Sequence, residues 1–155
     1  MTEYFEFLHA EYNPNGLTGN VGGNITETEL IPSVNELFVP IDTSTVGESY
    51  YQYRKCWARQ IAGHFSTLSV ELSNLEQTGR IGYAMESGAI ITGDSPTGMP
   101  TGLTEGDFFG NVEASINIGT GVPGDEFGIW LRHLHCSGSD PDSIYSFGIR
   151  IIGTE

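Results

Sequence analysis

Apolar and polar residues alternate with a period of two in much of the second half of the chain. In the segment 67–73, Leu68, Val70 and Leu72 are separated by polar residues. Successive side chains of a β-strand point to opposite faces of the sheet, so this pattern predicts a strand with one buried face. The same alternation is found in the segments 80–85, 108–118, 126–132 and 143–152. Residues 49–61 add a long, aromatic strand candidate.

These segments predict an all-β fold. Turn-forming residues separate them, and the only helix-like window, 71–79, lacks an apolar stripe. Several short strands with regular turns are typical of an immunoglobulin-like two-sheet β-sandwich. The chain has 155 residues, 21 of them glycine, which fits one turn-rich domain.

Two segments are predicted to contact other proteins. The first 48 residues contain no Lys or Arg and predict an extended N-terminal arm with edge strands, followed by a sandwich domain at 49–155. Apolar residues in this arm are predicted to dock on a partner: Leu37, Phe38, Val39 and Ile41. The polar stretch 87–107 is longer than an ordinary hairpin loop, which is typical of a functional or docking loop.

The charge of the chain excludes several partners. There are 20 acidic and 6 basic residues, a formal net charge of −14. Such a chain repels phosphate backbones and anionic lipid headgroups, so we expect neither a nucleic-acid nor a membrane partner. The N-terminus also lacks the basic start of a secretion signal, so we expect a soluble protein made in the cytoplasm.

The basic residues allow two interpretations. All of them lie in predicted strands: Arg54, Lys55, Arg59, Arg80, Arg132 and Arg150. They could form a positive stripe on one sheet face, in which case Arg54, Lys55 and Arg59 would bind an acidic partner surface. Alternatively, they could pair across strands with acids such as Glu71.

Candidate chemistry is sparse. The string Gly119-Thr-Gly-Val-Pro-Gly124 matches GxGxxG but leads into a strand, so it predicts a hairpin turn and no nucleotide site. His133 and His135 share a strand face and are candidate metal ligands, together with His64, Asp140 or Asp142. We favour the alternative of two half-exposed histidines, and predict no metal, no cofactor and no catalytic residue. Cys56 and Cys136 are interpreted as free thiols or as a bridge between the sheets.

Three blocks of sequence carry a resemblance. They are Gly22-Gly-Asn-Ile-Thr-Glu-Thr-Glu-Leu30 followed by Asn35-Glu-Leu-Phe38, then Tyr53-Arg-Lys-Cys-Trp-Ala-Arg59, then Gly128-Ile-Trp-Leu-Arg132 followed by Tyr145-Ser-Phe-Gly-Ile-Arg-Ile-Ile-Gly153. In this order and spacing they resemble a family of small bacteriophage virion proteins encoded among head and tail genes. The chain departs from the family pattern at His133-Leu-His-Cys136, where the family has apolar or small residues.

The resemblance implies a non-enzymatic structural component of the virion. We expect a capsid decoration (cement) protein or a tail or neck accessory protein that binds the major capsid or tail protein and forms a homo-oligomer. A competing interpretation is a carbohydrate-binding β-sandwich for host-surface attachment, with aromatic candidates at Tyr50, Tyr51, Trp57 and Trp130. If the tryptophans instead pack between the sheets, they cannot bind sugars. A metal-dependent enzyme built on His133 and His135 is the third alternative.

Overall fold

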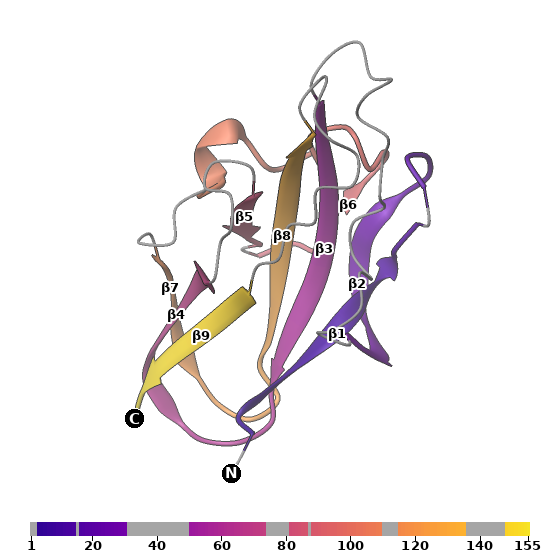
Figure 1. Ribbon diagram of the computed structural model, residues 1–155. Coiled ribbons are helices and arrows are strands. Elements are labelled where there is room, and N and C mark those ends of the chain that lie inside the picture. Colours follow the sequence, from indigo (N-terminus) through magenta and orange to yellow (C-terminus); the bar gives the residue numbers. More distant parts are fainter. Residues whose placement is uncertain are drawn as a thin grey trace.

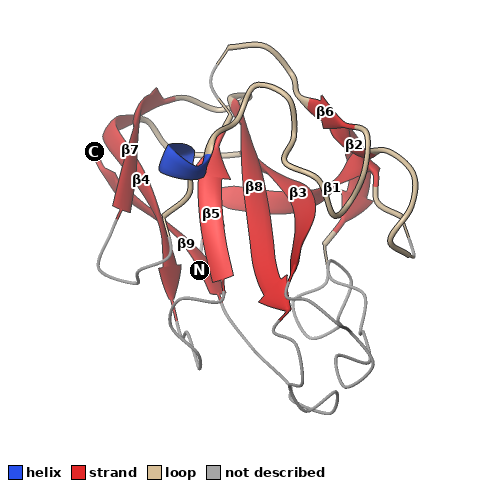
Figure 2. Cartoon of the chain, turned by 90° about the horizontal axis from the view of Figure 1, so that it is seen from above, coloured by secondary structure: helices blue, strands red, loops and turns tan. Residues whose placement is uncertain are grey.

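The chain folds into two antiparallel β-sheets (Figures 1 and 2). This computed structural model describes residues 3–14, 16–30, 50–73, 81–86, 88–109, 115–135 and 148–155. The strands in these ranges are β1 (Phe5–Tyr12), β2 (Val21–Glu29), β3 (Tyr50–Gln60), β4 (Phe65–Ser73), β5 (Ile81–Met85), β6 (Thr92–Gly93), β7 (Ser115–Gly121), β8 (Glu126–His135) and β9 (Gly148–Thr154), with a 3-10 turn, η2 (Glu105–Asp107). The predicted all-β class is confirmed, and an immunoglobulin-like strand order stays a prediction.

The first core lies between the two sheets. The larger sheet has the order β5-β8-β3-β1-β2-β6, and the smaller one has the order β7-β4-β9. Val70 and Leu72 of β4 pack against residues of the larger sheet such as Cys56, Ile129 and Leu131. The alternation of apolar residues in β4 therefore faces the larger sheet, as the sequence predicts. A hydrogen bond from Tyr83 Oη to the Val70 carbonyl oxygen, 2.7 Å long, links the sheets directly.

A second core lies on the opposite face of the larger sheet. Tyr53 of β3 and Trp130 of β8 pack there with Val21, Leu103 and Phe108. Much of its cover comes from the segment 88–109, which contains β6 and whose backbone is bonded to the sheet at several places. The amide of Tyr53 donates to Pro96 O, and the amide of Gly23 donates to Ile91 O. The long polar stretch predicted to be a docking loop is thus, in large part, the cover of a buried sheet face.

The N-terminal region contributes more than an arm and edge strands. β1 lies inside the larger sheet, between β2 and β3, and pairs with β3 from Phe5↔Gln60 to His9↔Cys56. This corrects the predicted boundary between residues 48 and 49, because backbone hydrogen bonding joins strands from both sides of it. Phe7 and Leu8 are suited to such an inner strand, since they add apolar surface to opposite faces of the sheet.

Part of the predicted arm lies outside the described residues. This part includes all four apolar residues chosen as docking contacts, namely Leu37, Phe38, Val39 and Ile41. Residues 110–114 and 136–147 also lie outside, so the predicted strands at 108–118 and 143–152 are seen only in part, as β7 and β9. No helix within the described ranges has the length and apolar character needed to cross a membrane.

Candidate functional site

A buried ion pair lies on the outer face of the larger sheet, which is the face that points away from the smaller sheet. Alternation along β3 places Tyr53, Lys55 and Trp57 on this face, and Lys55 lies opposite Trp130 of β8 in the strand register. Glu86 follows the last residue of β5 and reaches the same place. The Lys55 Nζ atom lies 2.7 Å from Oε1 and 2.8 Å from Oε2 of Glu86. The two side chains are 0% and 4% exposed.

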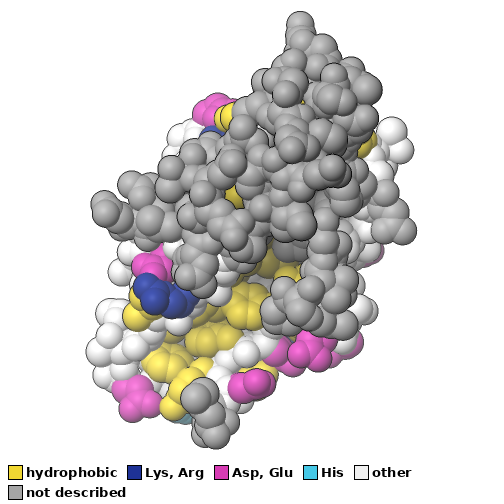
Figure 3. Space-filling model, in the orientation of Figure 1, with side chains coloured by type: hydrophobic (Ala, Val, Ile, Leu, Met, Phe, Trp, Pro, Cys, Tyr) yellow, Lys and Arg dark blue, Asp and Glu magenta, His cyan; other side chains and the backbone are white. Residues whose placement is uncertain are grey.

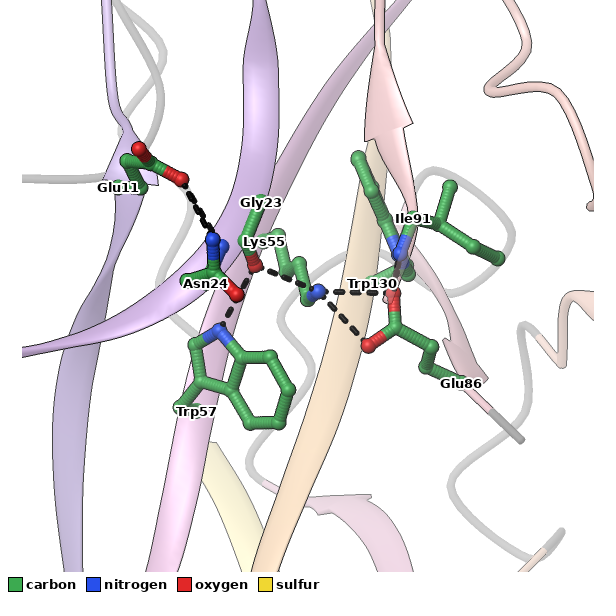
Figure 4. Close-up of polar contacts among 8 residues, drawn as sticks. All are labelled: Glu11, Gly23, Asn24, Lys55, Trp57, Glu86, Ile91 and Trp130. Atoms are coloured by element: carbon green, nitrogen blue, oxygen red, sulfur yellow. Dashed lines mark hydrogen bonds and ion pairs between the residues drawn. The ribbon is translucent and has the colours of Figure 1, made fainter. Parts of the chain in front are cut away.

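Backbone and indole groups complete the hydrogen bonding of this pair (Figure 4). Lys55 Nζ also donates to the carbonyl oxygen of Gly23 at 2.9 Å, and Trp57 Nε1 donates to the same oxygen at 3.2 Å. On the other side, Glu86 Oε1 accepts from the Ile91 amide at 2.6 Å and from Trp130 Nε1 at 3.3 Å. The cluster therefore ties together β2, β3, β8 and the segment that follows β5.

Aromatic rings and a glycine shape the space around the pair. The ammonium group lies 4.2 Å from the ring centroid of Trp57 and 5.7 Å from that of Trp130. Such contacts favour a cation that has lost its water. A Cβ atom at Gly128 would lie 2.6 Å from Glu86 Oε2 and 3.0 Å from Lys55 Cε. Only glycine at this position leaves room for the two side chains to meet.

Burial and charge act on Lys55 in opposite directions. Desolvation is the larger effect and lowers the pKa of Lys55, while the hydrogen bond and the charge of Glu86 raise it. A buried pair of this kind adds little net stability compared with apolar residues of the same shape. Removing only one partner, however, leaves a buried charge and costs about 3–5 kcal/mol. The pair is therefore a point at which the fold tolerates little change.

Arg54 lies on the other face of β3 and has a different environment. Its side chain is fully buried and donates to three carbonyl oxygens, those of Tyr53, Pro14 and Gly16. Its Nε atom has no hydrogen-bond partner among the described residues. Desolvation lowers the pKa of Arg54 to about 10. Through these carbonyl contacts, Arg54 fastens the turn between β1 and β2 onto β3.

The other basic residues in the described ranges are paired with carboxylates. Arg59 contacts Glu6 and Glu27, Arg132 contacts Glu105, and Arg150 contacts Glu71. Glu71 is the acid that the sequence suggested as a cross-strand partner, and it lies opposite Arg150 in the register of β4 and β9. Arg80 lies outside the described residues.

The structure thus corrects the prediction of a positive stripe formed by Arg54, Lys55 and Arg59. Arg54 and Lys55 are buried on opposite faces of β3, because strand neighbours point in opposite directions and both faces of this strand are covered. Arg59 is engaged by two glutamates. The alternative interpretation, pairing within the chain, is confirmed for Lys55, Arg59, Arg132 and Arg150.

The histidine candidates are not gathered into a metal site in the described part of the chain. His133 and His135 belong to β8, where the register places them opposite Gln52 and Tyr50 of β3. His64 follows the opposite end of β3, and Asp140 and Asp142 lie outside the described residues. No group of three metal-binding side chains occurs in the ranges that the structure describes.

The remaining candidates have structural positions. Gly119–Gly124 forms the end of β7 and the turn into β8. The predicted hairpin is wrong, because β7 and β8 belong to different sheets and the turn connects the two layers. Cys56 is a buried free thiol whose pKa is raised to about 12 by desolvation, while Cys136 lies outside the described residues.

The two tryptophans considered for sugar binding are not available on the surface. Trp57 and Trp130 are both buried, which is the outcome that excludes them as a sugar platform. They pack on the outer face of the larger sheet, each in a cluster separate from the core between the sheets. The prediction that they pack between the sheets is therefore wrong, and only their burial is confirmed.

The Lys55–Glu86 cluster was not predicted from the sequence. Its one signal is the near-continuous run of large residues in 50–60, which is typical of a strand covered on both faces. The chain matches no known protein-family model, and no curated protein or solved structure is significantly similar to it. The resemblance to phage virion proteins consequently stays a prediction.

Proposed function

We propose that this protein is a non-enzymatic structural component of a bacteriophage virion, a capsid decoration (cement) or tail and neck accessory protein that binds neighbouring virion proteins. The observation that carries the proposal is the double-sided burial of the larger sheet. Charged and aromatic side chains that could do chemistry, namely Lys55, Glu86, Trp57 and Trp130, are instead buried on the outer face of the larger sheet. Such a body suits a protein whose role is mechanical.

The distribution of charge supports the same role. Among the described residues, four basic side chains pair with carboxylates and Arg54 binds backbone carbonyls, so these cations do not offset the exposed acids. Acids such as Glu11, Glu29 and Asp107 are exposed. A strongly acidic exterior keeps a protein made in many copies soluble before assembly, and it favours neighbours with basic contact surfaces.

One end of the sandwich offers an apolar contact area. Tyr4, Ile61 and Val122 are exposed there, and the Ile61 amide donates to the Tyr4 carbonyl oxygen. Val122 belongs to the turn after β7, which is bonded to Gln60 through the Gly124 amide. Figure 3 shows apolar side chains exposed on the visible face, with acidic and basic side chains at their border. Exposed apolar areas with a charged border suit docking on a neighbouring protein.

Two stretches of the resemblance blocks lie in the centre of the larger sheet. Tyr53–Arg59 and Gly128–Arg132 lie in β3 and β8, which pair with one another along their length. Lys55 and Trp130, one from each block, are direct register partners. The blocks therefore include the residues that build the second core, which is the part of a structural protein that a shared fold would require.

Microscopy of purified particles tests the proposal. A phage that encodes this chain with an epitope tag is purified and labelled with a gold-conjugated antibody. We expect label at regular positions on the head, the neck or the tail, and label in the same amount after a high-salt wash would indicate an integral component. Particles without label, together with tagged protein left in the lysate, would overturn the proposal. Sugar-specific binding on a glycan array would then favour the attachment module.

A further inference from the structure

The geometry points to the free edge of β9 as a docking site for one extended segment of a neighbouring protein. In this segment apolar residues alternate with polar ones, and Lys or Arg lies at its ends. When bound, the segment adds a fourth strand to the smaller sheet. This inference goes beyond a place in a virion, because any neighbour that supplies such a segment fits the site.

The first step of the argument is a comparison of the sheet edges. At the edge formed by β5, Tyr83 and Phe109 exchange two backbone hydrogen bonds of 2.8 and 2.9 Å. At the opposite edge of that sheet, β6 has only 2 residues. In the smaller sheet, the register of the edge strand β7 with β4 is irregular. Cover, short length and bulges are the means by which proteins prevent their sheet edges from binding further strands.

The edge strand β9 has none of these protections. It pairs with β4 over all 7 of its residues without a register shift, and it pairs with no other described strand. It contains no proline, and its one charged residue is Arg150. The Arg150 Nε atom donates to Glu71 Oε1 of β4 at 2.7 Å, so this charge is engaged within the sheet. Such an edge is a template for an added strand, whose main-chain hydrogen bonds give affinity.

The second step is the apolar surface beside this edge. Phe7 of β1 and Ile151 of β9 pack against the core between the sheets but are only partly buried. Phe65 links the ends of the two strands, because its ring stacks on Phe5 and a Cβ atom at Gly153 would lie 2.5 Å from it. In the view shared by Figures 1 and 3, apolar atoms are uncovered between β9 and the start of β1. An added strand with apolar residues at alternate positions covers this surface.

The third step is the charge at the border, which selects the occupant. Glu3 precedes β1 and Glu155 follows β9; both are exposed, and neither forms an ion pair with another described residue. Lys or Arg at the ends of an incoming segment complements these acids. A second copy of this chain brings the same acids and a formal net charge of −14, which opposes its approach. The occupant is therefore a basic segment of a different protein.

Binding of a synthetic peptide to the full-length protein tests the inference. The probe is a fluorescein-labelled peptide of alternating Val and Thr with Lys at each end, as long as β9. We expect its fluorescence anisotropy to rise on binding, and amide hydrogen exchange in 148–155 to become slower in the complex. Absence of binding, or slower exchange only outside β9, would overturn the inference.

Two modified peptides distinguish an added strand from a purely apolar contact. A strand at a sheet edge is bonded through every second one of its residues, and the others point their amides to the opposite side. N-methylation of one alternate set of amides should therefore abolish binding, whereas N-methylation of the other set should leave it unchanged. Equal effects of the two modifications would show that no strand is added.

A pair of protein variants tests the charge argument. Glu155→Gln should bind the peptide about 2- to 5-fold more weakly, which is the effect expected of one exposed charge pair. Asp94→Asn removes an exposed acid far from β9 in the sequence and should bind like the wild type. Equal affinities of the two variants would refute the choice of a basic occupant. Peptide binding together with unlabelled particles would overturn the virion role alone, and labelled particles without peptide binding would overturn this inference alone.

Discussion

Replacing Gly22 with alanine is expected to destabilise the second core strongly. Gly22 lies in β2 with a φ of 88°, a backbone conformation that glycine adopts without strain and other residues do not. A Cβ atom at this position would lie 2.5 Å from Trp130 Cη2, 2.6 Å from Cζ2 and 3.0 Å from Ile91 O. The indole is fully buried and cannot move away without disturbing the cover of the sheet.

The magnitude follows from two separate effects. A left-handed backbone conformation costs alanine about 1–2 kcal/mol, and forcing a methyl group into a packed core costs about 1–3 kcal/mol. The expected loss in the free energy of unfolding is their sum, about 2–5 kcal/mol. Gly19 provides a matched control, because its φ is 99° but a Cβ atom added there would meet no heavy atom within 4 Å. Gly19→Ala should therefore show only the backbone effect.

Urea unfolding followed by tryptophan fluorescence measures both variants, because Trp130 reports on the site of the change. Gly22→Ala should have the lower midpoint, and the difference between the two variants should correspond to the steric effect, about 1–3 kcal/mol. Equal losses in the two variants would refute the reasoning, since they would show that Trp130 does not restrict this position.

Three further predictions concern the core between the sheets. Tyr83→Phe removes the hydrogen bond from Tyr83 Oη to Val70 O, so it should lower the free energy of unfolding by about 0.5–1.5 kcal/mol in urea unfolding followed by circular dichroism. An unchanged midpoint would contradict this. In a Cys136→Ser variant, the Cys56 thiol should not react with a thiol reagent at pH 8 until the protein is unfolded. Burial raises the pKa of this thiol to about 12 and so removes the reactive thiolate. Rapid labelling of the native protein would contradict this, because it would show that the reagent reaches the core between the sheets. In the folded protein, the pKa values of Cys56 and Tyr83 are both raised to about 12, whereas the unfolded chain releases these protons near pH 9 and 10. Between these pH values the unfolded state binds fewer protons than the folded state, so the free energy of unfolding should fall as the pH rises from about 9 to 12. The urea midpoint should therefore be lower at about pH 11 than at about pH 8.

Strands with one buried and one exposed face can be predicted from the sequence. Alternation in 67–73 and 126–132 identifies β4 and β8, and the residues it assigns to the buried face, such as Val70 and Ile129, do lie between the sheets. This works because a half-buried strand needs apolar residues at every second position only. The pairing of Arg150 with Glu71 was open to the same reasoning, because both are on the polar side of their strands.

The second core was not predictable in this way. Alternation tells which residues share a face, but it does not tell that a second layer covers the polar face. Lys55 reads as a solvated charge until the segment 88–109 is known to fold over it. The partner of Lys55, Glu86, is 31 residues away, and no local pattern links the two. The otherwise polar stretch contains three apolar residues that pack on the sheet and hold the segment over it, namely Ile91, Leu103 and Phe108.

Both tryptophans lie on the same side of the larger sheet, away from the three-stranded one. Intrinsic fluorescence consequently reports on only half of the molecule. A variant in which β4, β7 and β9 detach could keep a native emission spectrum, and only a probe such as the Cys56 thiol would reveal the change.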